Sequence, residues 1–329
     1  MIISANSHII SVNLLIGNNN NLKTSDKSIK PMEKPSYFLM PRDFVFPHEN
    51  FPLGVKKITD QTEHSYHVHE DFSELVVIGR GHAVHLIDDV EYPIGPGDVF
   101  VILGDRIHAY TGIRGDFEIN NILFDWKKLD MPLYDLERCT GFQVLFNIDP
   151  QSREKNRFEN RFRLNAAQLS AVREIIDEME LVLNSSEQGY QFRAITSFYR
   201  LINNLVVNYS QVETVLGLHS IPHLLGELVS CMERDYARPI TIEEMCRRTN
   251  MSRANLFRQF KRYFQETPLT YLQGIRMEQA TRLLLNSELS MGEIAGMTGF
   301  SDGTYFARQF RASTGFRPGE FRKEFQPEK

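Results

Sequence analysis

The spacing of hydrophobic residues changes along the chain. From Tyr37 to about Asp125, short runs of alternating apolar and polar residues are separated by Gly, Pro and Asp. This alternation is typical of strands, because successive side chains on a strand point to opposite faces. Regularly spaced turns, such as Gly95 to Asp98, favour a sandwich or a barrel. The clearest predicted strands are Glu74–Ile78, Ala83–Ile87, Val99–Leu103 and Ile119–Phe124.

The spacing then becomes helical over two long stretches. Apolar residues recur every three or four positions from Leu164 to Leu183, where Asn165 is placed to cap the helix, and from about Gln188 to Tyr209. The apolar stripe of the second stretch is broad, which suggests that this helix packs on the β-rich region and on a partner. Two interpretations stay open, since the helices can form a homodimer contact or simply close the barrel.

The last third of the chain contains two copies of one pattern, the first beginning at Thr241 and the second at Ser290. Each copy has an N-cap residue followed three positions later by a glutamate, then a turn with Asn or Gly, then a serine that can cap a second helix. These residues are Thr241, Glu244, Asn250 and Ser252 in one copy, and Ser290, Glu293, Gly299 and Ser301 in the other. Two helices joined by so short a turn form a helix-turn-helix, whose second helix enters the DNA major groove.

The second copy ends in the pattern GF-x-D-x-x-YF-x-R-x-F-x-x-x-x-G-x-x-P, from Gly299 to Pro318. Together with the stretch Leu269–Asn286 that joins the copies, it resembles the DNA-binding domain of AraC-family transcription regulators. The resemblance is strong over roughly the last hundred residues and weak over the middle of the chain. It implies a partner of double-stranded DNA, read by helix-turn-helix units at 241–262 and 290–312, and a default role as an activator that contacts RNA polymerase.

The resemblance also assigns roles to individual residues of the two second helices. Arg258 and Arg308 are placed to bond guanine bidentately, while Phe257 either packs on a thymine methyl group or belongs to the core. Lys261, Arg262 and Arg311 are expected to hold phosphates. The full predicted interface comprises Arg253, Ala254, Phe257, Arg258, Lys261 and Arg262 in the first unit, and Gly303, Thr304, Ala307, Arg308 and Arg311 in the second.

The β-rich region carries the run HVHEDFSELVVIGRG and, later, PGDVFVILGDRIH, which resemble the two motifs of the cupin barrel. Leu103, Asp105 and Gly112 depart from the second motif. In a cupin enzyme the histidines and glutamate of these motifs would bind a metal, whereas in a regulator the same polar ring can hydrogen-bond a sugar. The favoured interpretation is an organic effector pocket without cofactor or metal, and a metal site and an empty barrel are the alternatives. The predicted effector residues are His67, His69, Glu74, His108 and Tyr110.

The sensor segment from His67 to Asp89 is most similar to that of rhamnose-responsive regulators of the same family, which points to a pentose, a deoxyhexose or a related sugar. Phe72, Tyr110 and Trp126 are the aromatic residues that could stack on it, although each also fits a core position. Two other functions remain open: a metal-binding cupin enzyme or metal sensor fused to a DNA-binding domain, and a DNA-binding protein whose barrel is only a dimerisation scaffold. The sequence contains no catalytic Ser/His/Asp set, phosphate loop or dinucleotide fingerprint, so no enzyme activity is expected.

Composition and charge divide the chain in the same way. Residues 221–329 contain 16 Lys and Arg against 13 Asp and Glu, a net charge of +3, while the remainder carries −8. Three widely separated cysteines and the lack of a long apolar run favour a cytoplasmic protein that does not enter a membrane. We therefore expect a multidomain α+β fold with four segments: a disordered or mis-started N-terminus (1–36), a cupin-like sensor with dimerisation helices (37–210), a linker (211–222) and an all-α DNA-binding domain (223–329).

Overall fold

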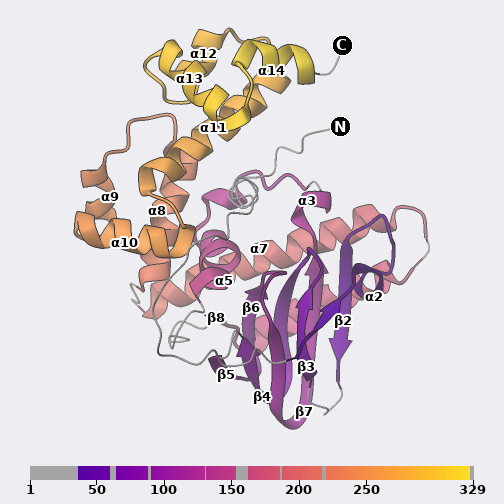
Figure 1. Cartoon of the computed structure of the whole chain (residues 1–329). Coiled ribbons are helices and arrows are strands. Elements are labelled where there is room, and N and C mark those ends of the chain that lie inside the picture. The colour runs from indigo at the N-terminus through magenta and orange to yellow at the C-terminus, as the bar shows by residue number, and fades with distance from the viewer. Residues whose placement is uncertain are drawn as a thin grey trace. The chain divides into compact units, whose positions relative to one another are not determined.

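The computed structural model describes residues 36–59, 64–87, 90–129, 131–152, 162–185, 187–216 and 220–326. Within these residues the chain forms two compact units, a β-rich unit and a helical unit (Figure 1). The β-rich unit contains the residues up to Met131 and Asp149–Leu218, and the helical unit contains Pro132–Ile148 and the chain from His219 onward. The N-terminal segment expected to be disordered or mis-started lies almost wholly outside the described residues.

The β-rich unit is built on one eight-stranded sheet, in the order β1-β3-β7-β4-β6-β8, with β2 also pairing with β7 and β5 with β4. All pairs are antiparallel except β1 with β3. The predicted strands at 74–78 and 83–87 are two parts of one long strand, β4. The strands are β1 (Phe38–Met40), β2 (Leu53–Ile58), β3 (His64–His69), β4 (Ser73–Ile87), β5 (Val90–Ile94), β6 (Asp98–Ile102), β7 (His108–Phe124) and β8 (Phe162–Arg163).

Strands β4 and β7 pair along most of their length and organise the core. Their register shifts between Ile78 and Val84, so the alternation of inward and outward side chains is interrupted there. Side chains from β4, β5, β6 and β7 pack into one buried cluster. The turn before β6 forms as expected: Gly97 adopts a φ of +86°, and Asp98 Oδ2 accepts a hydrogen bond from the Gly95 N–H at 2.8 Å.

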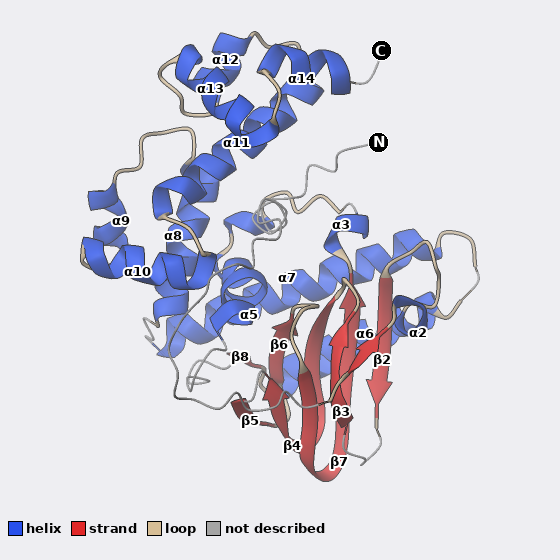
Figure 2. Cartoon of the chain, in the orientation of Figure 1, coloured by secondary structure: helices blue, strands red, loops and turns tan. Residues whose placement is uncertain are grey.

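Two long helices of this unit, α6 (Ala166–Leu183) and α7 (Tyr190–Leu216), pass behind the strands in Figure 2. Asn165 and Gln168 form a full capping box at the start of α6, which confirms the predicted cap. Lys57 of β2 pairs with Asp177 and Glu180 of α6, so this helix lies beside the sheet. Helix α7 continues to Leu216, beyond the expected end at Tyr209, and so takes up half of the segment predicted as linker. The short helices are α2 (Arg42–Val45), α3 (Trp126–Leu129) and α5 (Asp149–Ser152).

The helical unit contains both helix-turn-helix motifs. Its helices are α8 (Ile221–Asp235), α9 (Ile242–Thr249), α10 (Arg253–Phe264), α11 (Pro268–Asn286), α12 (Met291–Met297), α13 (Gly303–Thr314) and α14 (Pro318–Phe325). Asn250 with φ of 51° and Gly299 with φ of 81° occupy the two predicted left-handed turn positions. Leu256, Phe260, Phe306 and Phe310 are fully buried, as their helical spacing predicts.

Two predicted helix caps are wrong in detail. Helix α13 is capped by Asp302, whose Oδ1 accepts from the Thr304 N–H at 2.8 Å, and not by Ser301. Helix α9 is capped by the Thr241 side chain, but Glu244 does not return to the cap because its carboxylate is bound by Arg238. At α12 the expected box of Ser290 and Glu293 is complete.

Residues Pro132–Ile148, here called the strap, belong to the helical unit although the chain before and after them is part of the β-rich unit. The strap contains η1 (Leu136–Arg138), α4 (Thr140–Phe142) and the π-helical η2 (Gln143–Ile148). It packs on α8, where Gly226 leaves room for Val144: a Cβ on Gly226 would lie 2.6 Å from Val144 Cγ2. No sequence pattern predicts this contact, and the expected division of the chain places these residues in the sensor.

Candidate DNA interface and ligand site

Helix α10 exposes the residues predicted to face DNA in the first motif. Arg253, Ala254, Arg258, Lys261 and Arg262 are exposed, whereas Leu256, Phe260 and Phe264 on the opposite side are buried. The Arg258 side chain donates to Asn255 Oδ1 at 2.7 Å, which holds the guanidinium along the helix.

Phe257, for which a role in the core or at DNA was left open, is half-buried. The Arg253 guanidinium lies 5.7 Å from its ring centroid. The ring is therefore neither a fully buried core residue nor a fully exposed one.

Helix α13 presents the equivalent face of the second motif. Gly303, Thr304, Arg308 and Arg311 are exposed, and Ala307 is half-buried. The Arg308 guanidinium lies 5.2 Å from the ring centroid of Tyr305. This contact restricts the position of the guanidinium, which stays exposed to solvent.

Three arginines gather beside this face around an open hollow lined by Ala307, Arg308, Arg311, Ala312 and Arg317. Arg317 lies immediately before α14 and was not among the residues predicted to contact DNA. Guanidinium groups bind phosphate oxygens bidentately, and so the hollow suits a DNA backbone phosphate. Arg317 is the variable position just before Pro318 in the GF…P pattern, and that position was a signal that could have identified it.

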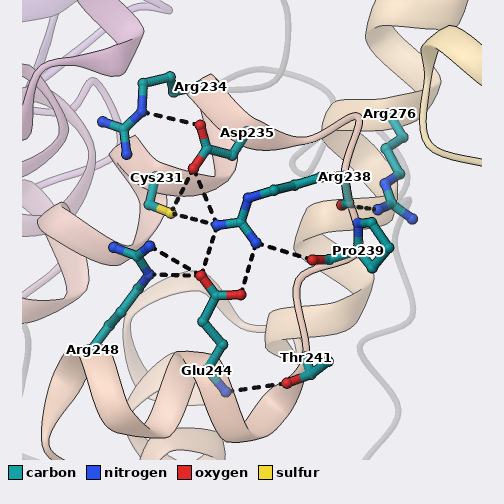
Figure 3. Close-up of polar contacts among 9 residues, drawn as sticks. All are labelled: Cys231, Arg234, Asp235, Arg238, Pro239, Thr241, Glu244, Arg248 and Arg276. Carbon is teal, nitrogen blue, oxygen red and sulfur yellow. Dashed lines mark hydrogen bonds and ion pairs between the residues drawn. The ribbon is translucent and has the colours of Figure 1, made fainter.

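The first motif is held in place by an ion-pair network at the end of α8 (Figure 3). Arg238 donates to both carboxylate oxygens of Glu244, at 2.7 and 2.8 Å, and to Asp235 at 3.1 Å. The hydrogen bonds from Arg238 and Arg248 to Glu244 lower the pKa of this carboxyl to about 2. Arg276 of α11 donates to the carbonyls of Tyr236 and Arg238, which connects the same loop to the helix between the two motifs. The network thus orients α9, and α10 follows it through a turn of only three residues.

In the β-rich unit, four of the five predicted effector residues come together at the sheet. His67 and His69 lie on β3, Glu74 on β4 and His108 on β7, and their donor atoms all lie within 4.8 Å of one another. His69 Nε2 is 3.1 Å and His108 Nε2 is 3.4 Å from Glu74 Oε2. Pairing of His67 with His108 in the β3–β7 register brings the two histidines together.

The site is almost sealed from solvent. The exposed fractions are 9% for His67, 4% for His69, 1% for Glu74 and 0% for His108. Burial, helped by the neighbouring His108, lowers the pKa of His67 to about 3. Burial alone would raise the pKa of Glu74, but hydrogen bonds and charge interactions with His108 and His69 hold it well below its usual range. Among the described residues, this cluster is the group of His, Cys, Asp and Glu side chains whose donor atoms could surround one metal ion.

Tyr110, the fifth predicted effector residue, lies deeper in the sheet. It belongs to the apolar core cluster and stacks on His85 with ring centroids 4.7 Å apart. His85 is fully buried 5.7 Å from the ring of His108 and was missed by sequence reasoning. In a regular strand His85, eleven positions after Glu74, would point to the opposite face, but the register shifts in β4 reverse that parity. Phe72 is also buried and stacks on His69, while Trp126 is half-buried.

Comparison with known proteins agrees with this arrangement. Residues 54–202 match the AraC-like ligand binding domain, and residues 245–324 match a helix-turn-helix domain of the type called HTH_18. The chain is an AraC-family regulator. AraC-family proteins with both domains are DNA-binding transcription regulators and not enzymes, and this chain has the same class of function.

Relatives match over most of the chain. The HTH-type transcriptional activator RhaR of Salmonella schwarzengrund is 27% identical over 284 residues, which are 86% of this chain and 95% of the relative, and RhaR of Salmonella arizonae is equally similar. The DNA-binding domain of AdpA, solved in complex with a target DNA, is 31% identical over 31% of this chain and 91% of that chain, with a TM-score of 0.30. No helix in the described part of the chain is both long and apolar enough to span a membrane.

Proposed function

We propose that this AraC-family regulator activates transcription at specific promoters when a sugar or a similar small effector binds its β-rich unit. The observation that carries the DNA-binding part is the pair of recognition helices, α10 and α13, which expose Arg258 and Arg308 at equivalent positions while burying Phe260 and Phe310. Similarity to proteins named as transcriptional activators supports activation, and not repression, of transcription.

The effector proposal rests on the position of the polar cluster. His67, His69, Glu74 and His108 lie in the domain that matches a ligand-binding family. Such a group of buried polar atoms is costly unless a ligand or an ion satisfies it. We place the effector at this end of the sheet, with Tyr110 forming part of the inner wall. The resemblance of the sensor segment to rhamnose-responsive regulators favours a pentose or a deoxyhexose.

The assembly is proposed to be a cytoplasmic homodimer that contacts RNA polymerase. Helices α6 and α7 leave Leu181 and Phe192 exposed at 75% and 76%, and large apolar residues so exposed are often covered by a partner. A dimer would place four recognition helices on an operator, and the spacing of its half-sites would follow from the symmetry.

The strap is the proposed route from effector to DNA. Its two ends continue into the β-rich unit, whereas its body packs on α8, and Glu137 lies 4.0 Å from Arg282 of α11. An effector that alters the β-rich unit would therefore act on the helix before the first motif and on the helix between the motifs. Such coupling requires only that the effector prefer one of two arrangements of the strap.

The test is selection of binding sites from random DNA by the full-length chain, followed by thermal melts with a panel of sugars. We expect enrichment of one motif, and a rise in stability with one sugar of about 2.7 kcal/mol at a hundredfold excess over Kd. Failure to enrich any sequence would overturn the DNA-binding proposal. Enrichment without a response to any sugar would retain the regulator but reject the sugar effector.

A further inference from the structure

The Arg276 side chain, which projects from α11, joins the helix between the two motifs to the loop before the first motif. Its Nε donates to the Tyr236 carbonyl at 2.8 Å, and its Nη2 donates to the Arg238 carbonyl at 2.9 Å, the bond drawn in Figure 3. Carbonyls at the C-terminal end of a helix, here α8, are left without partners inside the helix. A guanidinium can bind two such groups at once because its donors are fixed in one plane. These bonds therefore hold α11 against the end of α8.

The same guanidinium also contacts the second motif. Its central carbon lies 5.8 Å from the ring centroid of Phe300, which is buried in the turn between α12 and α13. The neighbouring Gly299, with a φ of 81°, lies so close that a Cβ added to it would be 2.9 Å from Arg276 Nε. The same Cβ would be 2.8 Å from the Tyr236 carbonyl oxygen. The turn of the second motif thus packs on both the guanidinium and the loop that the guanidinium binds.

Further contacts of α11 hold each motif separately. Tyr271 packs on Phe260 of α10 with ring centroids 5.6 Å apart. Gln273, two residues further along α11, hydrogen-bonds Gln309 of α13. Each of these contacts fixes one recognition helix on α11, but neither spans the two motifs. Arg276 differs because its guanidinium meets the loop before one motif and the turn inside the other, so rotation of one motif relative to the other would break its contacts.

We propose that Arg276 is a positioning residue, which fixes the distance and angle between α10 and α13 and so makes the protein selective for one spacing of its two DNA segments. The inference rests on the proposed function, because it concerns how the same recognition helices are held. Arg276 acts through these helices and not on DNA, since its guanidinium is half-buried and already bound to two carbonyls. Spacing then contributes to specificity, because a site with the right bases at the wrong distance leaves one recognition helix without its contacts.

The test is equilibrium binding of the full-length chain to the DNA site that it selects, and to the same site with two base pairs inserted between the two segments that one protomer reads. This insertion turns one segment by about 70° relative to the other. The wild type should lose about 10-fold or more in affinity, comparable with the effect of one mismatched base pair. Arg276→Met keeps the stem of the side chain but removes the guanidinium, so the insertion should cost it less. We expect a coupling of about 5-fold or more between the substitution and the insertion.

Arg234→Met is the matched control. Arg234 is an exposed arginine at the end of α8 whose Nε donates to Asp235 at 3.1 Å, so its loss removes the same charge near the same loop. This variant should show the full wild-type loss on insertion. The slope of log affinity against log salt should be the same for Arg276→Met as for the wild type, because a positioning residue holds no phosphate.

Thermal melts show whether each variant is folded, and Arg276→Lys decides the test if Arg276→Met is not. Lysine keeps the charge but lacks the planar pair of donors, so it should also tolerate the insertion better than the wild type. The inference is overturned if a folded Arg276 variant shows the full wild-type loss, or if its salt slope is reduced. A wild type that binds both sites equally well overturns it too. Failure of the wild type to select any DNA site would instead overturn the proposed function, and that result is obtained before the spacing is varied.

Discussion

Arg258 and Arg308 occupy equivalent positions in the two recognition helices, and both are exposed while partly restrained. Arg258 is held by Asn255 and Arg308 lies against Tyr305. A restrained guanidinium loses less side-chain entropy when it bonds a base than a freely rotating one does. Lys261, one turn further along α10, bonds the Gln265 carbonyl at the end of the helix, and a lysine there acts on phosphate as a point charge.

These differences predict two distinct effects on DNA binding. Arg258→Ala should cost about 1–3 kcal/mol on the selected site and relax the preference at one base pair. Lys261→Ala should weaken binding to all sequences alike and reduce the slope of log K against log salt by about one. Equilibrium binding at several salt concentrations, on the selected site and on single-base variants, separates the two. Equal losses on all sequences for Arg258→Ala would remove it from the base-reading surface.

Glu266, in the turn between α10 and α11, predicts a pH effect on stability. Burial raises the pKa of its carboxyl to about 7, with Lys261 opposing the shift, and its Oε1 atom has no hydrogen-bond partner. The folded state therefore holds a proton that the unfolded state has lost, and stability falls as pH rises from about 4.5 to 7. Glu266→Gln should be more stable than the wild type above pH 7, with the difference disappearing below about pH 5.

Thermal melts from pH 4 to pH 8 measure this difference. Glu243→Gln is a suitable comparison, since backbone and Thr241 hydrogen bonds lower the pKa of that exposed carboxyl. It should gain no stability at pH 8. A constant difference between Glu266→Gln and the wild type at every pH would contradict the assignment.

At the scale of elements, the sequence predicts the turns and helix caps that are determined by neighbouring residues in the chain. Asn250 and Gly299 identify the two turns because few other residues adopt a left-handed conformation there. Ser301 and Asp302 are both good caps one position apart, so the sequence could not decide between them. The docking of the strap on α8 could not be predicted. Phe142, Val144 and Phe146 are apolar, which predicts that they are buried but not which element they contact. Their partner, α8, is about 80 residues away in the chain.

The docking of the strap on α8 predicts a measurable effect at Gly226. Alanine normally stabilises a helix by about 1 kcal/mol relative to glycine. At Gly226 the added Cβ would lie 2.6 Å from Val144 Cγ2, so Gly226→Ala should lower the melting temperature of the chain. Gly292→Ala in α12 is the matched control, because a Cβ there meets nothing within 4 Å and should be neutral or stabilising. A rise in stability for both variants would show that the strap does not pack on α8 in solution.

At the scale of the whole molecule, the division into a β-rich unit and a double helix-turn-helix unit could be predicted from the sequence, as could the exposure of most residues on the predicted recognition faces. The convergence of His67, His69, Glu74 and His108 was also predictable, because the resemblance to the two cupin motifs implies that these side chains share one site. The tightness of that cluster was not, since it depends on the register of β3 with β7 and on the bulges of β4. Those features follow from long-range pairing and are not apparent in any single segment.

The most direct test of the account is a hydroxyl-radical footprint of the full-length chain on the DNA site that it selects. If α10 and α13 both read DNA, each protomer should protect two segments whose centres lie about 10–10.5 base pairs apart, on one face of the helix. Arg308→Ala should weaken protection of one segment and Arg258→Ala that of the other. Protection of a single segment per protomer, or loss of both segments together in each variant, would contradict a double reader of this design.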